Sequence, residues 1–243
     1  MRPARHFCFF TAALLTLVAP AAEIRVTGSD LLGDSFTRAV AEYARQNDTV
    51  VKLDLRGTRP GRADLTAGRA DVGLFLLPAG EPPPGDPLVS RVIAYQVAVV
   101  VVPVASPLRQ VTTAQLRGVF ALSAGDAFSR WGELNLIGEW TSRSIALRAL
   151  SPAAEVAGLR VLALAASPTD PAYAPTAENV HSGGYPLRMP LYVTFSRQAA
   201  PDLQLFLKFL LADEAAAALA PAHFVPLPLG ARNQLVFELE EMR

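Results

Sequence analysis

The chain has 243 residues, of which 51% are hydrophobic and 18% are charged. This composition excludes a disordered or collagen-like chain, and a single cysteine excludes a framework of disulfides. Because 22 Lys and Arg residues balance 22 Asp and Glu residues, we expect no strongly basic face for nucleic acid. At about 150 residues per domain, the length allows one large domain or two small lobes.

The first 21 residues have the pattern of a secretory signal peptide. Arg2 and Arg5 precede an apolar run over residues 7–18, and small residues up to Ala21 are typical of a cleavage site. The run is too short to span a bilayer, and no later stretch reaches the roughly 18 apolar residues of a membrane helix. Cys8 would leave with the signal. We expect a periplasmic or secreted protein with no stable membrane insertion after cleavage.

The N-terminal part of the mature chain alternates short β-branched runs with amphipathic segments. The pattern predicts strands over residues 23–27, 50–55 and 70–77, with helices over 31–46 and 62–68 between them. This βαβαβ order favours α/β layers over a β-sandwich or a helix bundle.

The middle of the chain begins with a proline-rich connection over residues 78–87. The apolar run 89–103 is too long for an average strand, so we expect it to bend or to pass between layers. Thr112 or Thr113 can cap a helix that ends near Phe120.

The C-terminal half combines further strands with longer helices. Residues 145–150 and 159–165 are predicted to be strands or core segments, and 167–176 a loop. The remaining predictions are a strand over 191–195, a long helix over 202–219 and a helical tail over 235–242.

Several short strings of this sequence resemble, in the same order, the periplasmic phosphate-binding proteins of ABC transporters. Each is weak alone, but the ordered set covers most of the mature chain. The strings include Gly28-Ser29-Asp30, Asp71-Val72-Gly73, Trp131-Gly132-Glu133-Leu134, Gly184-Tyr185-Pro186-Leu187 and Phe224-Val225-Pro226-Leu227.

The resemblance implies a two-lobed, hinged α/β fold of the type II periplasmic binding proteins, with the ligand between the lobes. Lobe one would comprise residues 22–92 plus 191–243, and lobe two residues 93–190. Lobe two is expected to be abridged, because the stretch 160–182 looks shorter than in the family. The implied function is binding of an inorganic oxyanion, phosphate first, for uptake through a membrane ABC permease.

A tetrahedral oxyanion needs converging donors, and helix N-termini supply free N–H groups at a positive dipole end. Gly28, Ser29 and Asp30 lie at such a strand-to-helix junction, where Gly28 permits close backbone approach. The Ser29 hydroxyl can donate to an anion. The alternative is that it simply caps the helix.

A second loop of this kind follows the next predicted strand. In the resembled family a Ser- and Gly-rich turn here contacts the ligand, and Gly57 and Thr58 are the matching positions. Pro60 removes one amide donor, whereas Arg59 can grip an oxyanion with two parallel hydrogen bonds. The alternative is a solvated arginine cluster.

In lobe two, the family uses an arginine that leads into Ser-Gly-Thr at a helix start. The nearest match is Arg148 with Ser151, followed here by Pro152 and Ala153 in place of Gly and Thr. The polar pair that the family carries after its Asp-Ile-Gly-like string is replaced by apolar residues 74–77. Each lost charge-assisted hydrogen bond forfeits about 1.5–3 kcal/mol, so these departures weaken the expected affinity.

Two other classes of function compete with solute binding. An enzyme is not expected: His181 and His223 lack metal-ligand spacing, and the sequence contains no nucleophile elbow or phosphate loop. We likewise expect no cofactor. The stronger alternative is a scaffold, sensor or envelope accessory protein that keeps the fold and has lost tight oxyanion binding. Arginines that converge on a cleft favour the binder, and arginines that face solvent favour the scaffold.

Overall fold

The computed structural model describes residues 23–78, 80–121, 127–148 and 157–242. The predicted signal segment and Ser151 lie outside these residues. The α/β prediction and the βαβαβ order are confirmed. No helix in the described ranges is long and apolar enough to cross a membrane.

The larger part of the molecule is built on a six-stranded mixed sheet with the order β10-β4-β9-β3-β1-β2. β1 pairs in parallel with β2 and β3, whereas β9 is antiparallel to β3 and β4, and β10 is antiparallel to β4. The strands are β1 (Glu23–Gly28), β2 (Val50–Asp54), β3 (Val72–Leu76), β4 (Leu88–Val97), β9 (Arg188–Ser196) and β10 (Phe224–Pro226). β3 is almost entirely buried, as its continuous apolar sequence requires of a strand covered on both faces.

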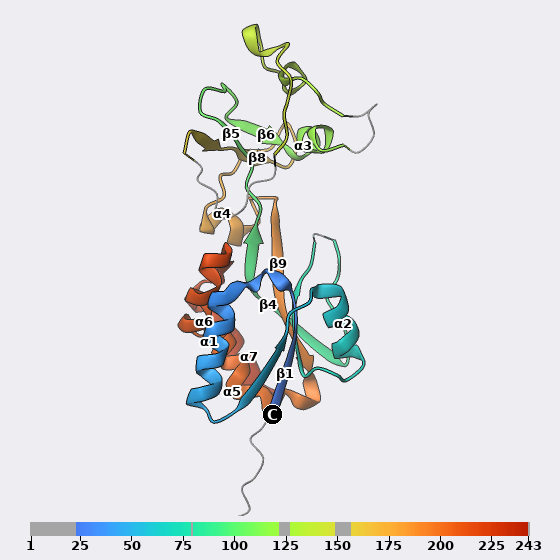
Figure 1. Ribbon diagram of the computed structural model, residues 1–243, viewed down its shortest axis with the longest axis vertical. Helices are drawn as coiled ribbons and strands as arrows, with labels where there is room; N and C mark the ends of the chain where they lie inside the picture. Colours follow the sequence, from blue (N-terminus) through green and yellow to red (C-terminus); the bar gives the residue numbers. More distant parts are fainter. Residues whose placement is uncertain (1–22, 79, 122–126, 149–156, 243) are drawn as a thin grey trace, which may run out of the picture.

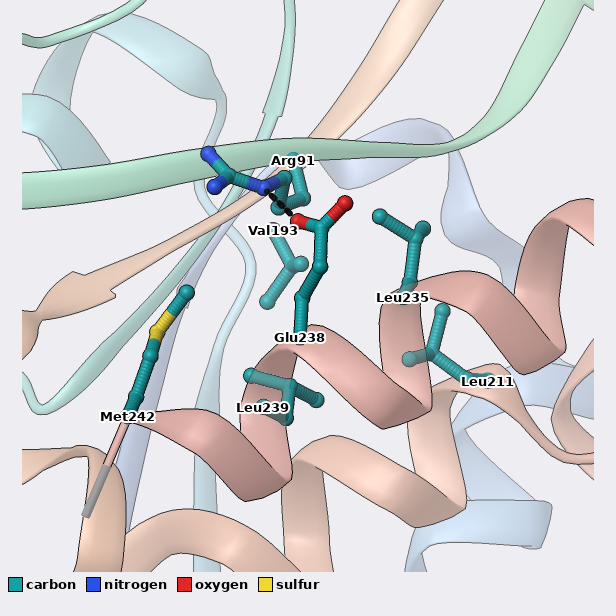
Figure 2. Close-up of a pocket in the computed structure, with 7 residues that line it drawn as sticks. All are labelled: Arg91, Val193, Leu211, Leu235, Glu238, Leu239 and Met242. Atoms are coloured by element: carbon teal, nitrogen blue, oxygen red, sulfur yellow. Dashed lines mark hydrogen bonds and ion pairs between the residues drawn. The ribbon is translucent and has the colours of Figure 1, made fainter.

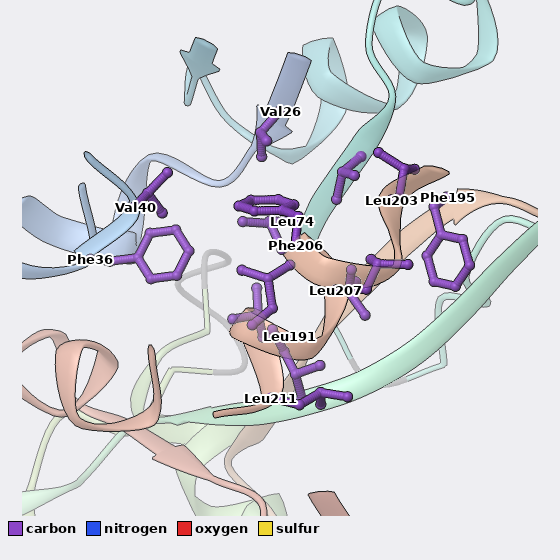
Figure 3. Packing of buried hydrophobic residues seen from close by; sticks show 14 of the residues in the cluster. Val26, Phe36, Val40, Leu74, Leu191, Phe195, Leu203, Phe206, Leu207 and Leu211 are labelled. Carbon is purple, nitrogen blue, oxygen red and sulfur yellow. The ribbon is translucent and has the colours of Figure 1, made fainter. Parts of the chain in front are cut away.

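Helices cover both faces of this sheet (Figure 1). On one face lie α1 (Gly33–Gln46), α5 (Ala200–Leu211), α6 (Asp213–Leu219) and α7 (Leu229–Glu241). On the other face lies α2 (Thr58–Thr66), which covers Phe75 and Leu77 with its Leu65. The main core fills the space between the first group and the sheet, where Phe36, Phe206 and Phe195 are buried with aliphatic neighbours (Figure 3).

A smaller region with its own core lies at the far end of β4 and β9 (Figure 1). It contains two two-stranded sheets, β5 with β7 and β6 with β8. Its elements are β5 (Val101–Pro103), β6 (Gln110–Thr112), α3 (Thr113–Val119), β7 (Leu159–Val161), β8 (Ala163–Ala165) and α4 (Ala177–Ser182). Short 3-10 turns complete the described chain: Asp30–Leu32, Trp131–Leu134, Gly138–Trp140, Arg197–Ala199 and Ala220–Ala222. The apolar run 89–103 therefore passes from the large sheet, as β4, into the smaller region, as β5, as predicted.

Three helix predictions were wrong in their bounds. The helix predicted from residue 62 begins at Thr58, and the tail helix begins at Leu229 rather than at 235. The long helix predicted over 202–219 is two helices, because Ala212 is extended, with ψ 165°. The described part of the segment 145–150 forms no strand, although Ile145 packs against the smaller core.

Candidate functional site

The loops that follow β1 and β2 lie side by side at the carboxyl ends of these strands. The Gly57 N–H donates to the Gly28 carbonyl at 2.8 Å, and the Ser29 N–H donates to the Leu74 carbonyl at 2.8 Å. Gly28 has φ +152°, and a Cβ there would overlap the Leu74 carbonyl, so only glycine fits. The structure thus brings together the two predicted loops of lobe one.

Ser29 is only 2% exposed and is the N-cap of the first 3-10 turn, Asp30–Leu32. Its Oγ accepts a hydrogen bond from the Leu31 N–H at 3.3 Å, which is the capping role considered above. Among the described residues, no acceptor takes the hydroxyl proton of Ser29. Capping therefore leaves this hydroxyl able to donate to a ligand, beside the exposed Asp30.

Thr58 is the first residue of α2, and its hydroxyl is already occupied. Its Oγ1 donates to the Leu76 carbonyl at 3.2 Å and accepts from the Leu76 N–H at 3.1 Å. A helix start leaves first-turn amides without intrahelical acceptors, but Gly57 donates to Gly28 and Pro60 has no N–H. The amides of Thr58 and Arg59 are the donors that this helix start still offers.

The arginines around this loop differ in their pairing. Arg56 binds Asp54 at 2.6 Å and Asp64 at 3.0 Å. Arg62 forms an ion pair with Glu81. Arg59 is exposed and has no hydrogen-bond or ion-pair partner in the described part of the chain. Arg59 is thus the guanidinium of this loop whose charge no neighbouring carboxylate neutralises.

The lobe-two candidates are not joined to these loops. Arg148 is exposed, and no described hydrogen bond or ion pair links it to residues 28–30 or 57–59. Ser151 falls outside the described residues. The Nε2–H of His181 donates to the Pro226 carbonyl oxygen at 2.9 Å. No group of three potential metal ligands occurs among the residues that the structure describes.

Two concave features are not lined by the residues of the predicted loops. The first is an apolar crevice of about 10 Å³ between α7 and the sheet, beside the Arg91–Glu238 ion pair at 2.9 Å (Figure 2). This volume has room for about one water molecule, so the crevice is a packing gap. The second is a hollow of about 310 Å³ where β4 and β9 leave the large sheet, lined in part by Tyr95, Arg188 and Tyr192. Sequence reasoning missed it because its walls are separated by about ninety residues and carry no motif.

Comparison with known proteins supports the fold. No family model and no curated protein matches this chain. A possible phosphate-binding protein from Planctomyces limnophilus superimposes with a TM-score of 0.68 at 17% identity, over 91% of this chain and 99% of that one. An ABC-type phosphate transport receptor from Vibrio cholerae gives 0.65 at 16% identity, over 85% and 100%. PstS from Borrelia burgdorferi gives 0.63 at 12% identity, over 85% and 99%.

The chain therefore has the α/β fold of the two-lobed periplasmic binding proteins. Within that class, the solved structures named above include a possible phosphate-binding protein and an ABC-type phosphate transport receptor.

Proposed function

We propose that this protein is an exported solute-binding protein that binds an inorganic oxyanion, phosphate first, for uptake by an ABC transporter. Lobe one would be residues 22–92 plus 191–243 and lobe two residues 93–190, with β4 and β9 as the hinge. The observation that carries the proposal is the hydrogen bond from Gly57 to Gly28, which holds two strand-to-helix loops against each other.

The lobe-one site would use few donors, and most come from the backbone. The Ser29 hydroxyl and the amides of Thr58 and Arg59 would bind oxyanion oxygens, and the Arg59 guanidinium would supply positive charge. Arg148 and Ser151 would complete the shell when the lobes close. Because each charge-assisted hydrogen bond contributes about 1.5–3 kcal/mol, such a shell supports micromolar affinity.

Isothermal titration calorimetry of residues 22–243 against phosphate tests this proposal, with sulfate, molybdate and phosphonates as competitors. The double variant Ser29→Ala, Arg148→Ala should abolish saturable binding. Arg143→Ala is the matched control, because this exposed arginine of the same region is already paired with Glu139 at 2.9 Å. Unchanged affinity in the double variant would remove Ser29 and Arg148 from the site.

A second candidate function follows from the pairing of the arginines. Arg56 and Arg62 are held by carboxylates, and the Thr58 hydroxyl is held by Leu76. These contacts, together with the exposure of Arg59 and Arg148, favour a binding-protein fold that serves as a scaffold, sensor or envelope accessory. If the wild-type protein shows no saturable binding of any oxyanion in the titrations, this function is favoured over transport.

A further inference from the structure

The hollow beside the paired strands β4 and β9 is a candidate ligand site that the residues of the predicted loops do not line. Its volume of about 310 Å³ lies at the lower end of the range for small-molecule sites, ~300–1,000 Å³. None of the residues at Gly28–Asp30 or Gly57–Arg59 lines it.

One wall of the hollow belongs to the large sheet. Tyr192 packs into the small core under α2 with Leu65 and Phe75, so its side chain lies on the α2 face. Pro190 is two residues earlier in the same strand and therefore projects from the same face. The Leu77 N–H donates to the Pro190 carbonyl at 3.2 Å, which places this wall at the carboxyl end of β3.

The opposite wall belongs to the smaller region. Tyr185 is fully buried in that core, and its hydroxyl donates to the Ala98 carbonyl at 2.8 Å. Tyr95 packs against the same core from β4. The hollow thus lies between these two cores, where the paired strands β4 and β9 run from the large sheet into the smaller region, and a molecule bound there would touch both.

Arg188 supplies the charge of the hollow. Its guanidinium carbon lies 4.6 Å from the centroid of the Tyr95 ring, and its Nη1 donates to the carbonyls of Val180 and His181. Gly183 makes room for this arrangement, since a Cβ there would lie 2.8 Å from Nη2. The guanidinium is held in place by neutral groups.

No carboxylate neutralises this half-buried cation. Among the described residues, Arg188 has no ion pair, and the lining of the hollow contains no Asp or Glu. A partly buried charge without a counter-charge favours an anionic ligand, and a stacked guanidinium presents a rigid fork for a carboxylate or phosphonate. Val92, Pro186 and Pro190 offer apolar contact for the rest of the molecule.

We propose that this hollow is a second ligand site for a small organic anion with a planar, apolar body. The anionic group would pair with Arg188, and the body would lie against the tyrosine and proline side chains. The site goes beyond the proposed oxyanion function and does not depend on it.

Titration of the mature chain with phenylacetate tests the site, with phenylacetamide and acetate as ligands that lack the charge or the body. We expect saturable binding of phenylacetate but not of phenylacetamide or acetate. Arg188→Gln should bind phenylacetate at least about tenfold more weakly than the wild type. Arg160→Gln is the matched control, because Arg160 also donates only to backbone carbonyls, of Val104 and Ser106 at 2.8 Å each. It should bind phenylacetate like the wild type.

Several results would overturn the site. These are no saturable phenylacetate binding at millimolar concentration, equal binding of phenylacetamide, or equal losses in the two arginine variants. If Arg188→Gln does not fold, the phenylacetate affinity of Tyr95→Leu tests the site instead, since this variant removes the stacked ring and keeps the guanidinium. Full affinity in Tyr95→Leu would reject the proposal. A parallel phosphate titration keeps the two sites apart, because phosphate should not compete with phenylacetate.

Discussion

The Thr58 hydroxyl and the backbone of Leu76 form a reciprocal pair: Oγ1 accepts from the Leu76 N–H at 3.1 Å and donates to its carbonyl at 3.2 Å. This pair docks the start of α2 onto the end of β3, where no further strand supplies those bonds. A hydroxyl at this position therefore fixes the loop without using the backbone amides of Thr58 and Arg59.

The first prediction concerns this pair. Thr58→Val keeps the shape of the side chain but leaves two backbone groups of Leu76 without partners, so it should lower the free energy of unfolding by about 1–3 kcal/mol. Urea unfolding followed by circular dichroism measures the loss. Thr58→Ser retains the hydroxyl and should recover most of the stability. A loss in Thr58→Ser without a loss in Thr58→Val would show that the methyl group, and not the hydroxyl, matters.

The second prediction concerns Arg25 and Asp71, which join β1 to the turn before β3. The Asp71 carboxylate accepts from the Arg25 backbone N–H at 2.8 Å, from Nε at 3.0 Å and from Nη2 at 2.7 Å. Burial alone raises the pKa of Asp71, but these hydrogen bonds outweigh it and hold the pKa below the ordinary 3.8.

A lowered folded-state pKa means that the stabilisation is present above about pH 4 and is lost as the pH falls below it. Asp71→Asn should therefore cost about 1 kcal/mol of unfolding free energy at pH 7 and much less at pH 3. Paired urea titrations at the two pH values measure this difference. A cost that does not change with pH would contradict the prediction. The exposed Glu42, paired with Arg45, serves as the control through Glu42→Gln and should have little effect at either pH.

The third prediction concerns alkaline stability. Tyr185 is fully buried, and burial raises its pKa to about 12. Between about pH 10 and 12 the unfolded chain releases this proton while the folded protein keeps it, so stability falls as the pH rises through that window. The loss should reach roughly 2–3 kcal/mol. Tyr185→Phe should remove this part of the pH dependence, as thermal unfolding at pH 8 and 11 would show. An unchanged slope in the variant would assign the loss to other groups.

The fourth prediction concerns Arg232, which explains the break between α5 and α6. This arginine is 8% exposed and donates to the Leu211 carbonyl at 2.7 Å and to the Leu227 carbonyl at 3.1 Å. Its Nη2 binds the exposed Asp213 carboxylate at 2.6 Å.

Arg232→Met should lower the unfolding free energy by about 3 kcal/mol, because it leaves buried carbonyls at a helix end without donors. Asp213→Asn should change it little, because this carboxylate is solvated. Differential scanning calorimetry of both variants makes the comparison. A larger loss in Asp213→Asn would show that the ion pair, and not the capping of carbonyls, holds the break.

Local patterns in the sequence were sufficient for much of the fold. The alternation around residues 23–77 predicted β1, α1, β2, α2 and β3, since each element buries one periodic face. Of the two predicted caps, Thr112 and Thr113, the structure has Thr112, whose Oγ1 accepts from the Gln115 N–H at 3.1 Å. Capping depends on residues three apart, so it is readable in a single sequence.

The candidate site was predictable only in part. A glycine followed by a hydroxyl residue after two predicted strands, Gly28-Ser29 and Gly57-Thr58, marked both loops as candidates for oxyanion binding. The same reasoning could not reveal that Thr58 would turn to Leu76 or that Arg62 would turn to Glu81. Leu76 lies eighteen residues after Thr58, at the end of β3, and Glu81 lies nineteen residues after Arg62, beyond β3. The fold, and not the local sequence, brings each pair together.

By itself, the sequence determined the α/β layering, the strand-to-helix loops and the passage of the apolar run 89–103 from the large sheet into the smaller region. These features follow from local periodicity and chain order. Only the tertiary structure decided which guanidinium groups are neutralised and which remain open. Arg56 and Arg62 meet carboxylates, whereas Arg59 stays exposed and Arg188 stacks on Tyr95 beside a hollow. Charge pairing acts over a few ångströms in space, and folding, not spacing along the chain, sets those distances.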